Sequence, residues 1–472
     1  MRRLSTPQTR TLDPRPRPAP TRMNHPAADP TQARPGLLAL DDALAALLAT
    51  AQPLREIEPV PLDEADGRVL AQALQAAFDV PGFDNSAMDG YAVRAAEAAA
   101  AHAAGAALPV SQRIAAGPVG AGEALGTAAG SAAALQPGTV ARIFTGAPLP
   151  AGADAVLVQE EAEASTDASG QPQVRLRKPA QLGQHIRRRG EDLGRGQTVL
   201  PAGTLLGPAE LGLAASLGAA QLPLHRRLRV ALLSSGDELA EPGSVPPEQL
   251  PLGAIYNSNR YFLRALLQRL GCSVSVCPPV PDRLDATVAA LRAAAANHDL
   301  VLSTGGVSVG EADHLKAAVQ ALGGLHLWQI AIKPGKPFAH GWLERDGEGA
   351  GANSGAGQRC HYIGLPGNPV ASYVTFMLLV QPFVRRLQGV QGPAANGLPE
   401  PIELPAHFDW PKPERRREFL RVRRNAHGGL ELYPNQGSGV LSSIAWADGL
   451  VDKAPNQTIA HGDRVAYRPF AA

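Results

Sequence analysis

Two of the chain's six lysines, Lys333 and Lys336, fall in one four-residue turn that also contains proline and glycine. Lysine is otherwise scarce, because arginine supplies most of the 44 basic residues. An apolar, strand-like run at 299–304 leads into Gly305 and Gly306, where the backbone can turn freely. Ammonium groups and the exposed N–H groups of a glycine turn both bind anions. The spacing predicts a site for an oxyanion or a phosphate.

Carboxylates also follow strand-like runs, at Asp237, Glu238, Asp282 and Asp313. A single carboxylate in such a place is most often a helix cap. Several of them at one sheet edge, facing the lysines, would hold Mg²⁺ against an anionic ligand. We therefore predict a magnesium site at Glu238, Asp282 and Asp313.

Three further polar positions have two interpretations each. Asp89 belongs to a loop that crowds four polar side chains into six positions, which is explained equally well by turn chemistry and by display toward a ligand. Thr145 follows a strand beside a glycine, a pattern that is more often a turn than a site. Arg187 begins a run of three arginines, which is either a solvated turn or a phosphate-binding group.

The elements that position these residues alternate between strand-like and helix-like patterns from residue 229 onward. This alternation predicts a central, doubly wound, mostly parallel αβα domain over 227–390. Ligands of such sheets bind outside the carboxyl ends of the strands. The loops expected to meet there are 234–238, 281–283, 303–313 and 366–369.

Changes in composition divide the rest of the multidomain chain. The predicted parts are a disordered Arg/Pro-rich tail (1–35), an N-terminal helix-containing linker module (36–80 and 179–226), a small β-domain inserted into it (81–178) and a C-terminal β-barrel-like domain (401–472). We expect helices at 37–50, 69–75 and 208–217 in the linker module and strands alone in the small domain. The Gly/Ala/Ser-rich stretch 346–360 is a predicted mobile insertion.

Composition and missing motifs exclude several function classes. The formal charge of +1 gives no overall attraction to nucleic acid, and no apolar run is long enough to span a membrane. Three cysteines without CxxC spacing indicate a reducing compartment, and we expect a cytoplasmic protein. There is no GxGxxG of dinucleotide type, no P-loop, no histidine pair at metal-ligand spacing and no evident Ser-His-Asp group.

Seven motifs in order resemble those of the molybdopterin molybdenumtransferases, the molybdenum-insertion enzymes whose relatives include the E domain of gephyrin. The motifs are FDNSAMDGYA (83–92), TGAP (145–148), IRRRGED (186–192), SGDEL (235–239), TGGVSVGEAD (304–313), IKPGKPF (332–338) and LPGNP (365–369). The resemblance covers about residues 36–470 and leaves out the tail and the 346–360 stretch. It implies that molybdate is inserted into adenylated molybdopterin, that AMP is released, and that Mg²⁺ assists.

The resemblance also implies which residues act. Its functional positions fall on Asp89, Thr145, Glu238, Asp282, Asp313, Lys333, Arg421 and Ser438. Substrate binding is expected to involve, besides Arg421 and Ser438, Arg187, Gly305, Gly306, Ser308, Lys336, Pro366 and Asn368. The family is implied to be an elongated homodimer with the site between subunits. The adenylyltransferase that supplies the substrate and the acceptor molybdoenzymes are further implied partners.

One departure from the family pattern is Gln329, where many members carry a lysine before the lysine turn. Glutamine can donate a hydrogen bond but brings no charge.

Two other functions remain open on residues alone: an adenylyltransferase or nucleotide hydrolase on the same αβ domain, and a scaffold or metabolite-binding protein. The flanking modules favour the transferase over the first, and Asp89, Asp313 and Lys333 favour it over the second.

Overall fold

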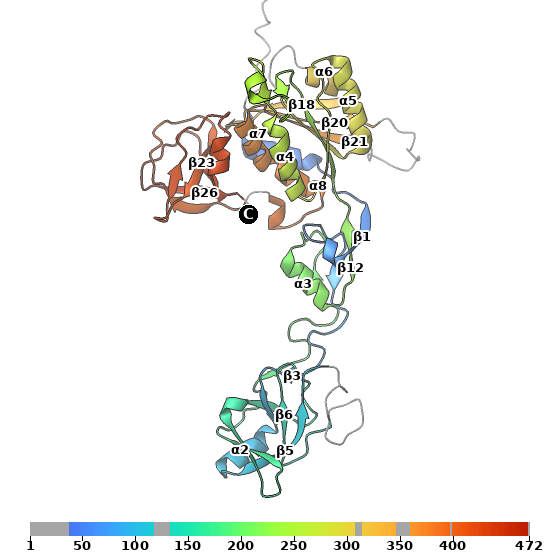
Figure 1. Ribbon diagram of the computed structural model, residues 1–472, viewed down its shortest axis with the longest axis vertical. Helices are drawn as coiled ribbons and strands as arrows, with labels where there is room; N and C mark the ends of the chain where they lie inside the picture. Colours follow the sequence, from blue (N-terminus) through green and yellow to red (C-terminus); the bar gives the residue numbers. More distant parts are fainter. Residues whose placement is uncertain (1–36, 118–132, 307–313, 346–358, 397–398, 471–472) are drawn as a thin grey trace, which may run out of the picture.

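The computed structural model describes residues 37–117, 133–306, 314–345, 359–396 and 399–470. The predicted tail, Ser308, Asp313 and most of the predicted insertion lie outside these residues. The molecule is elongated (Figure 1). The central and C-terminal domains lie beside each other at one end, the linker module follows, and the small β-domain forms the other end.

A six-stranded sheet forms the middle of the central domain, in the order β16-β13-β17-β21-β20-β18. The parallel strands are β16 (Ser273–Val276), β13 (Arg229–Ser234), β17 (Leu300–Thr304) and β21 (Arg359–Leu365). β20 (Pro337–Glu344) is antiparallel to both of its neighbours, β21 and β18 (Gly323–Gln329). This topology confirms the predicted, mostly parallel sheet.

Helices cover both faces of the sheet. One face carries α1 (Leu40–Thr50), α4 (Ser258–Arg269), α7 (Pro369–Thr375), a π-helical turn (Phe376–Val380) and α8 (Gln381–Leu387); the other carries α5 (Leu284–Asn297) and α6 (His314–Leu322). Along β13, Val230 and Leu232 pack on the first set, whereas Ala231 and Leu233 pack on the second. This alternation is what a sheet buried on both faces requires.

The first helix departs from the predicted division of the chain. We grouped residues 36–80 with the linker module, but α1 buries Leu40, Ala43 and Leu47 in the core of the central domain. Because the backbone of Leu38 donates to the carbonyl of Gln329 at 2.8 Å, the segment before α1 also joins that domain.

Short strand pairs and one helix build the linker module. The pairs are β1 (Ile57–Pro61) with β12 (Gln221–His225) and β2 (Leu74–Gln75) with β11 (Thr198–Leu200); the helix is α3 (Pro208–Ser216). A third pair, β3 (Asn85–Ser86) with β10 (Ile186–Arg187), belongs to the small domain, where Ile186 packs on its core (Figure 1). The predicted helix at 69–75 is wrong. Val69 and Leu70 form bridges to Leu205 and Leu224 instead, because extended pairing buries both side chains between chain segments from elsewhere.

The small domain is a six-stranded sheet with one helix. Its strands run in the order β7 (Ala155–Val158), β4 (Gly90–Val93), β6 (Val140–Ile143), β5 (Ala107–Ile114), β9 (Pro172–Leu176) and β8 (Ala162–Thr166). The prediction of strands alone missed α2 (Ala95–Ala103), whose alanine-rich sequence has the highest helix propensity. The Asp154 carboxylate accepts from the Ala95 N–H at 2.6 Å and satisfies the start of this helix.

The C-terminal domain contains a third six-stranded sheet, and one of its strands, β19, comes from the central part of the chain. Its order is β19 (Ile332–Lys333), β23 (Arg417–Arg424), β25 (Gly449–Lys453), β26 (Arg464–Pro469) and β22 (Ile402–Pro405), with β24 (Leu430–Leu432) paired to β23 and a short helix α9 (Ser442–Trp446). The chain leaves the central sheet at Gln329 and joins the C-terminal sheet at Ile332.

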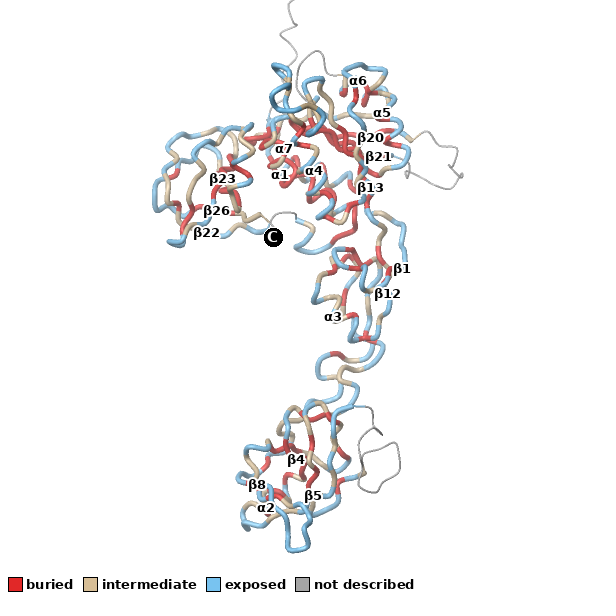
Figure 2. Tube along the Cα trace, viewed as in Figure 1, coloured by how far each residue is buried: buried red, intermediate tan, exposed pale blue. Residues whose placement is uncertain are grey.

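Each domain has its own buried residues, and Figure 2 shows them as separate groups along the molecule. No helix in the described part of the chain is both long and apolar enough to cross a membrane. The lysine turn connects β19 of the C-terminal sheet to β20 of the central sheet, so both domains fix its position.

Candidate active site

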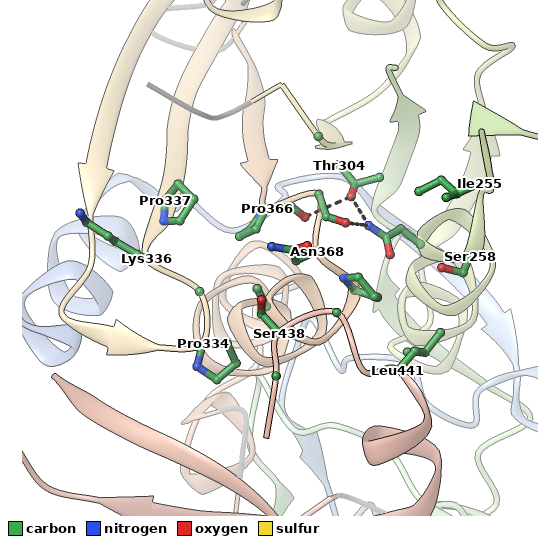
Figure 3. A pocket seen from close by; sticks show the side chains of 18 of the residues that line it. Ile255, Ser258, Thr304, Pro334, Lys336, Pro337, Pro366, Asn368, Ser438 and Leu441 are labelled. Atoms are coloured by element: carbon green, nitrogen blue, oxygen red, sulfur yellow. Dashed lines mark hydrogen bonds between the residues drawn. The ribbon is translucent and has the colours of Figure 1, made fainter. Parts of the chain in front are cut away.

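A pocket of about 1020 Å³ opens at the carboxyl ends of β13, β17 and β21, where the predicted loops were expected to meet (Figure 3). The αβα domain supplies Ser235, Glu238, Thr304, Gly305, Gly306, Pro366 and Asn368, together with the turn from Lys333 to Pro337. The C-terminal domain closes the pocket with Arg416 and the loop 436–439.

Glycines allow the strand-end loops to approach one another. Gly305 has φ +88°, and a Cβ there would lie 3.0 Å from the carbonyl oxygen of Ser235. Gly335, at φ +111° inside the lysine turn, would bring a Cβ within 2.4 Å of the Thr375 hydroxyl. Any side chain at either position would push the loops apart.

Asn259 links two of these loops and was not predicted as a site residue. Its buried side-chain amide donates to the Thr304 hydroxyl at 2.8 Å and to the Gly367 carbonyl at 2.7 Å (Figure 3). The available signal was an asparagine in the first turn of α4 beside the Asn257 cap, and it was too common a pattern to single out.

Lys333 lies between the pocket and two carboxylates. Its ammonium group is 2.9 Å from Glu418 and 3.5 Å from Glu414, and its side chain is 40% exposed. Glu418 is buried and also accepts from the Trp410 indole at 2.9 Å and faces Lys453 at 3.5 Å. These ion pairs hold the Lys333 side chain in one orientation at the pocket wall.

Two more cations line the pocket. Lys336 is exposed and belongs to the other side of the lysine turn (Figure 3). Arg416 is ion-paired with Glu414 at 3.1 Å, and hydrogen bonds from its guanidinium are the main reason that the pKa of Glu414 is lowered to about 2. Arg416 was missed because nothing in the sequence distinguishes it from its two arginine neighbours.

Ser438 lies where the two domains touch. Its carbonyl oxygen accepts from the Val370 N–H at 3.0 Å, at the start of α7 and next to Asn368 (Figure 3). Arg421, predicted to bind substrate, does not line the pocket. It is only 1% exposed and donates to the carbonyls of Phe419 and Gly437 and to the Ser443 hydroxyl, so it supports the Ser438 loop from behind. Burial lowers the pKa of Arg421 to about 10.

Only some of the carboxylates predicted to bind Mg²⁺ are placed near the pocket or near another carboxylate. Glu238 lines the pocket and folds over Gly236, whose φ is +139°. Asp282 lies beside the neighbouring loop: its N–H donates to the Asp237 carboxylate at 3.4 Å. Among the described residues no group of three or more His, Cys, Asp or Glu is placed to hold a metal, and Asp313 falls outside them.

The remaining predicted residues lie in the small domain and beside it, away from the pocket at the other end of the chain (Figure 1). Thr145 donates to the Asp89 carboxylate through its N–H at 2.7 Å and its hydroxyl at 2.8 Å. These bonds, with a smaller contribution from the charge of Arg142, lower the pKa of Asp89. Arg187 is in β10, which pairs with β3, and β3 belongs to the loop that also carries Asp89.

Comparison with protein families finds three consecutive matches. A model described as the MoeA N-terminal region (domains I and II) matches residues 38–218, a probable molybdopterin-binding domain matches 231–386, and the MoeA C-terminal region (domain IV) matches 403–470. Together, the matched ranges include the pocket-lining residues named above and the loop that carries Asp89.

Whole proteins match over similar lengths. The chain is 39% identical to a molybdopterin molybdenumtransferase of Haemophilus influenzae over 440 residues, which are 92% of this chain and 99% of that protein. It is 36% identical to the molybdopterin molybdenumtransferase of Synechococcus elongatus, over 86% of this chain and 93% of that protein. The crystal structure of a molybdopterin biosynthesis moeA protein from Pyrococcus horikoshii superposes with a TM-score of 0.74 and 27% identity, covering 92% of this chain and all of that one.

Proposed function

The chain belongs to the molybdopterin molybdenumtransferases, transferases that insert molybdenum during molybdenum cofactor biosynthesis, and we propose that its substrates are molybdate and adenylated molybdopterin and that it releases AMP with the help of Mg²⁺. One observation supports this most strongly. The pocket takes Lys333, Lys336 and Arg416 from two domains at the edge of the molybdopterin-binding domain. Three cations in one pocket suit a ligand that carries phosphates and a second, inorganic oxyanion.

The residues of the pocket have distinct tasks in this proposal. Lys336 and Arg416 bind the oxyanions, and the Gly305–Gly306 turn presents backbone N–H groups to the same space. Lys333, fixed by Glu418, holds molybdate next to the dithiolene sulfurs. Because the charges are in place before substrate arrives, little reorganisation is needed when the phosphoanhydride breaks and AMP leaves.

We propose that Mg²⁺ binds at the loops after β13 and β16. Glu238 lines the pocket, Asp237 and Asp282 lie side by side, and carboxylate oxygens are the ligands that Mg²⁺ prefers. Asp313 would complete the set. When bound, the ion would offset the negative charge of the phosphoanhydride.

We propose a homodimer in which the small domain of one chain reaches the pocket of the other. Support comes from the position of Asp89, Thr145 and Arg187, which lie away from the pocket of their own chain (Figure 1). A twofold pair of elongated chains could bring these residues to the partner's pocket. We further propose a cytoplasmic location, because Cys272, Cys277 and Cys360 are all free thiols.

The function is tested by incubating the full chain with adenylated molybdopterin and Mg²⁺, with and without molybdate, and measuring AMP. We expect AMP release that depends on molybdate, and about a 10- to 100-fold loss of kcat/KM in Lys336→Gln, since a charge-assisted hydrogen bond is worth about 1.5–3 kcal/mol. Lys412→Gln, an exposed lysine outside the pocket, is the control. Consumption of ATP with free molybdopterin would identify an adenylyltransferase, and binding without turnover would identify a scaffold.

A further inference from the structure

Two arginines of the small domain share one aromatic ring. The guanidinium carbons of Arg113 and Arg142 each lie 4.7 Å from the centroid of the Phe144 ring. Arg113 is in β5 and Arg142 in β6, and the two are direct partners in the parallel pairing of these strands. Phe144 follows Arg142 by two positions, so all three side chains lie on one face of the sheet. We call these three residues the arginine stack.

The stack gathers two positive charges, and the hydrogen-bond partners of Arg142 among the described residues carry no charge. Arg142 donates to the Gly90 carbonyl at 3.0 Å and to the Gln159 side chain at 2.6 Å, and both acceptors are uncharged. Within the described residues, neither Arg113 nor Arg142 has a carboxylate within ion-pairing distance. Like charges on adjacent strands repel each other, so this arrangement costs stability unless an anion joins it.

Other cations of the same region show the usual arrangement. Arg177 pairs with Glu163 at 3.0 Å, and Lys178 pairs with Glu161 at 2.7 Å. Arg113 and Arg142 lack such an ion pair among the described residues, and they adjoin Thr145, the residue after Phe144. The Asp89 carboxylate held by Thr145 supplies one negative charge against the two positive charges of the stack.

We propose that the arginine stack is an anion subsite that binds a phosphate group of the substrate beside Asp89 and Thr145. The guanidinium faces rest on the Phe144 ring, which fixes their orientation and leaves N–H groups at their edges for phosphate oxygens. A phosphate dianion matches two fixed guanidinium charges. This inference rests on the proposed function, because the adenylated substrate carries the phosphoanhydride.

The test uses the full chain and inorganic pyrophosphate as the probe, titrated by calorimetry in a Lys336→Gln background that weakens binding in the main pocket. Arg113→Gln is expected to weaken pyrophosphate binding about tenfold, which corresponds to about 1.4 kcal/mol. Arg113→Lys keeps the charge and should recover part of the affinity. The matched control is Arg175→Gln, an exposed arginine in β9 whose strand pairs with β5 at Ala107, about 20 Å along β5 from Arg113.

Kinetics provide the second measurement, in the otherwise unchanged enzyme. Arg113→Gln should raise the KM for adenylated molybdopterin by about tenfold, with kcat at saturation close to that of Arg175→Gln. Equal pyrophosphate affinity in Arg113→Gln and Arg175→Gln would overturn the subsite. A wild-type chain that releases no AMP would refute the proposed function instead, and the difference in pyrophosphate affinity between the two variants would then decide whether the subsite exists.

Discussion

The pocket of the central domain and the arginine stack of the small domain hold their positive charges in different ways. In the pocket, Lys333 and Arg416 are held by Glu414 and Glu418, and Glu418 is itself buried against Lys453. In the small domain, Arg113 and Arg142 have no such partner among the described residues and rest on an aromatic ring.

This difference indicates how the two regions work. Ion pairs with carboxylates fix the geometry of the pocket's cations without any ligand. The same carboxylates reduce the net positive charge of the pocket. In the small domain, Arg113 and Arg142 have no carboxylate partner among the described residues, and the Phe144 ring orients them instead. The pocket is thus pre-organised, whereas in our proposal the arginine stack gains its counter-charge from the ligand.

The largest expected effect is on stability, at Glu418. Glu418→Gln leaves Lys453, which is 2% exposed, without its carboxylate, and loss of one partner of a buried ion pair costs about 3–5 kcal/mol. Urea unfolding followed by tryptophan fluorescence measures this, because all four tryptophans lie in the central and C-terminal domains.

Glu431→Gln is the control for this change. Glu431 lies on the neighbouring strand β24 and pairs with Arg423 at the surface, where an ion pair is worth less than about 1 kcal/mol. If both variants unfold at the same urea concentration, the pocket is not held by its buried charges and the contrast with the small domain disappears.

The charge pairing behind this prediction could not be read from the sequence. The lysine turn and the glycine loops were predicted correctly as neighbours, because carboxyl ends of parallel strands share one sheet edge. The partner of Lys333 was not predicted, since Glu418 follows far along the chain and no local pattern marks it. Arg421 was placed in the substrate site for the same reason: a motif gives residue types, and only packing shows that this arginine faces inward.

The fold shows the same limit. Alternating strand and helix patterns predicted the αβα domain and its four parallel strands, because two-sided burial leaves a strong apolar pattern, but they missed the antiparallel strand β20. The helix at 69–75 was wrong and α2 was missed, because short segments with weak periodicity take their structure from their neighbours. The exchange of the chain between two sheets after Gln329 depends on pairing with β23, which no local signal encodes.

Acid should destabilise the central domain through His340 and His361. Burial is the main cause that lowers the pKa of His340 to about 3 and that of His361 to about 4. Unfolded histidines bind protons below about pH 6.5, whereas the folded ones stay neutral, so the unfolded state gains protons and stability falls as the pH drops from 6.5 toward 4. We expect a loss of about 5–6 kcal/mol over this range, about half of it from each histidine, measured by the same tryptophan signal.

The variant His340→Phe/His361→Phe should lose clearly less stability over that pH range. His427→Gln, at an exposed position, should behave like the wild type. An acid loss of equal size in all three proteins would show that the buried histidines do not dominate the acid response.

Mixing two inactive chains tests whether the two regions meet between subunits. Asp89→Asn damages the small-domain cluster, and Lys336→Gln damages the pocket. If each site combines the pocket of one chain with the small domain of the other, random exchange of subunits should restore about a quarter of wild-type activity, because half of the dimers then hold one intact site of two. AMP release after co-refolding measures this. Activity no greater than the sum of the separate variants would mean that each chain uses its own residues.

The smallest expected effect is a gain of molybdate affinity in Gln329→Lys. Gln329 ends β18 and pairs with Pro337, the residue directly after Lys336, so an added ammonium group would lie beside the lysine turn. The pocket already contains paired cations, and solvent screens a further charge at its edge, so the apparent KM for molybdate should fall only about two- to fivefold. Gln329→Met, which removes the hydrogen-bonding group without adding charge, is the matched control. An unchanged constant in the lysine variant would mean that molybdate lies away from this end of the turn, closer to Lys333 and the C-terminal domain.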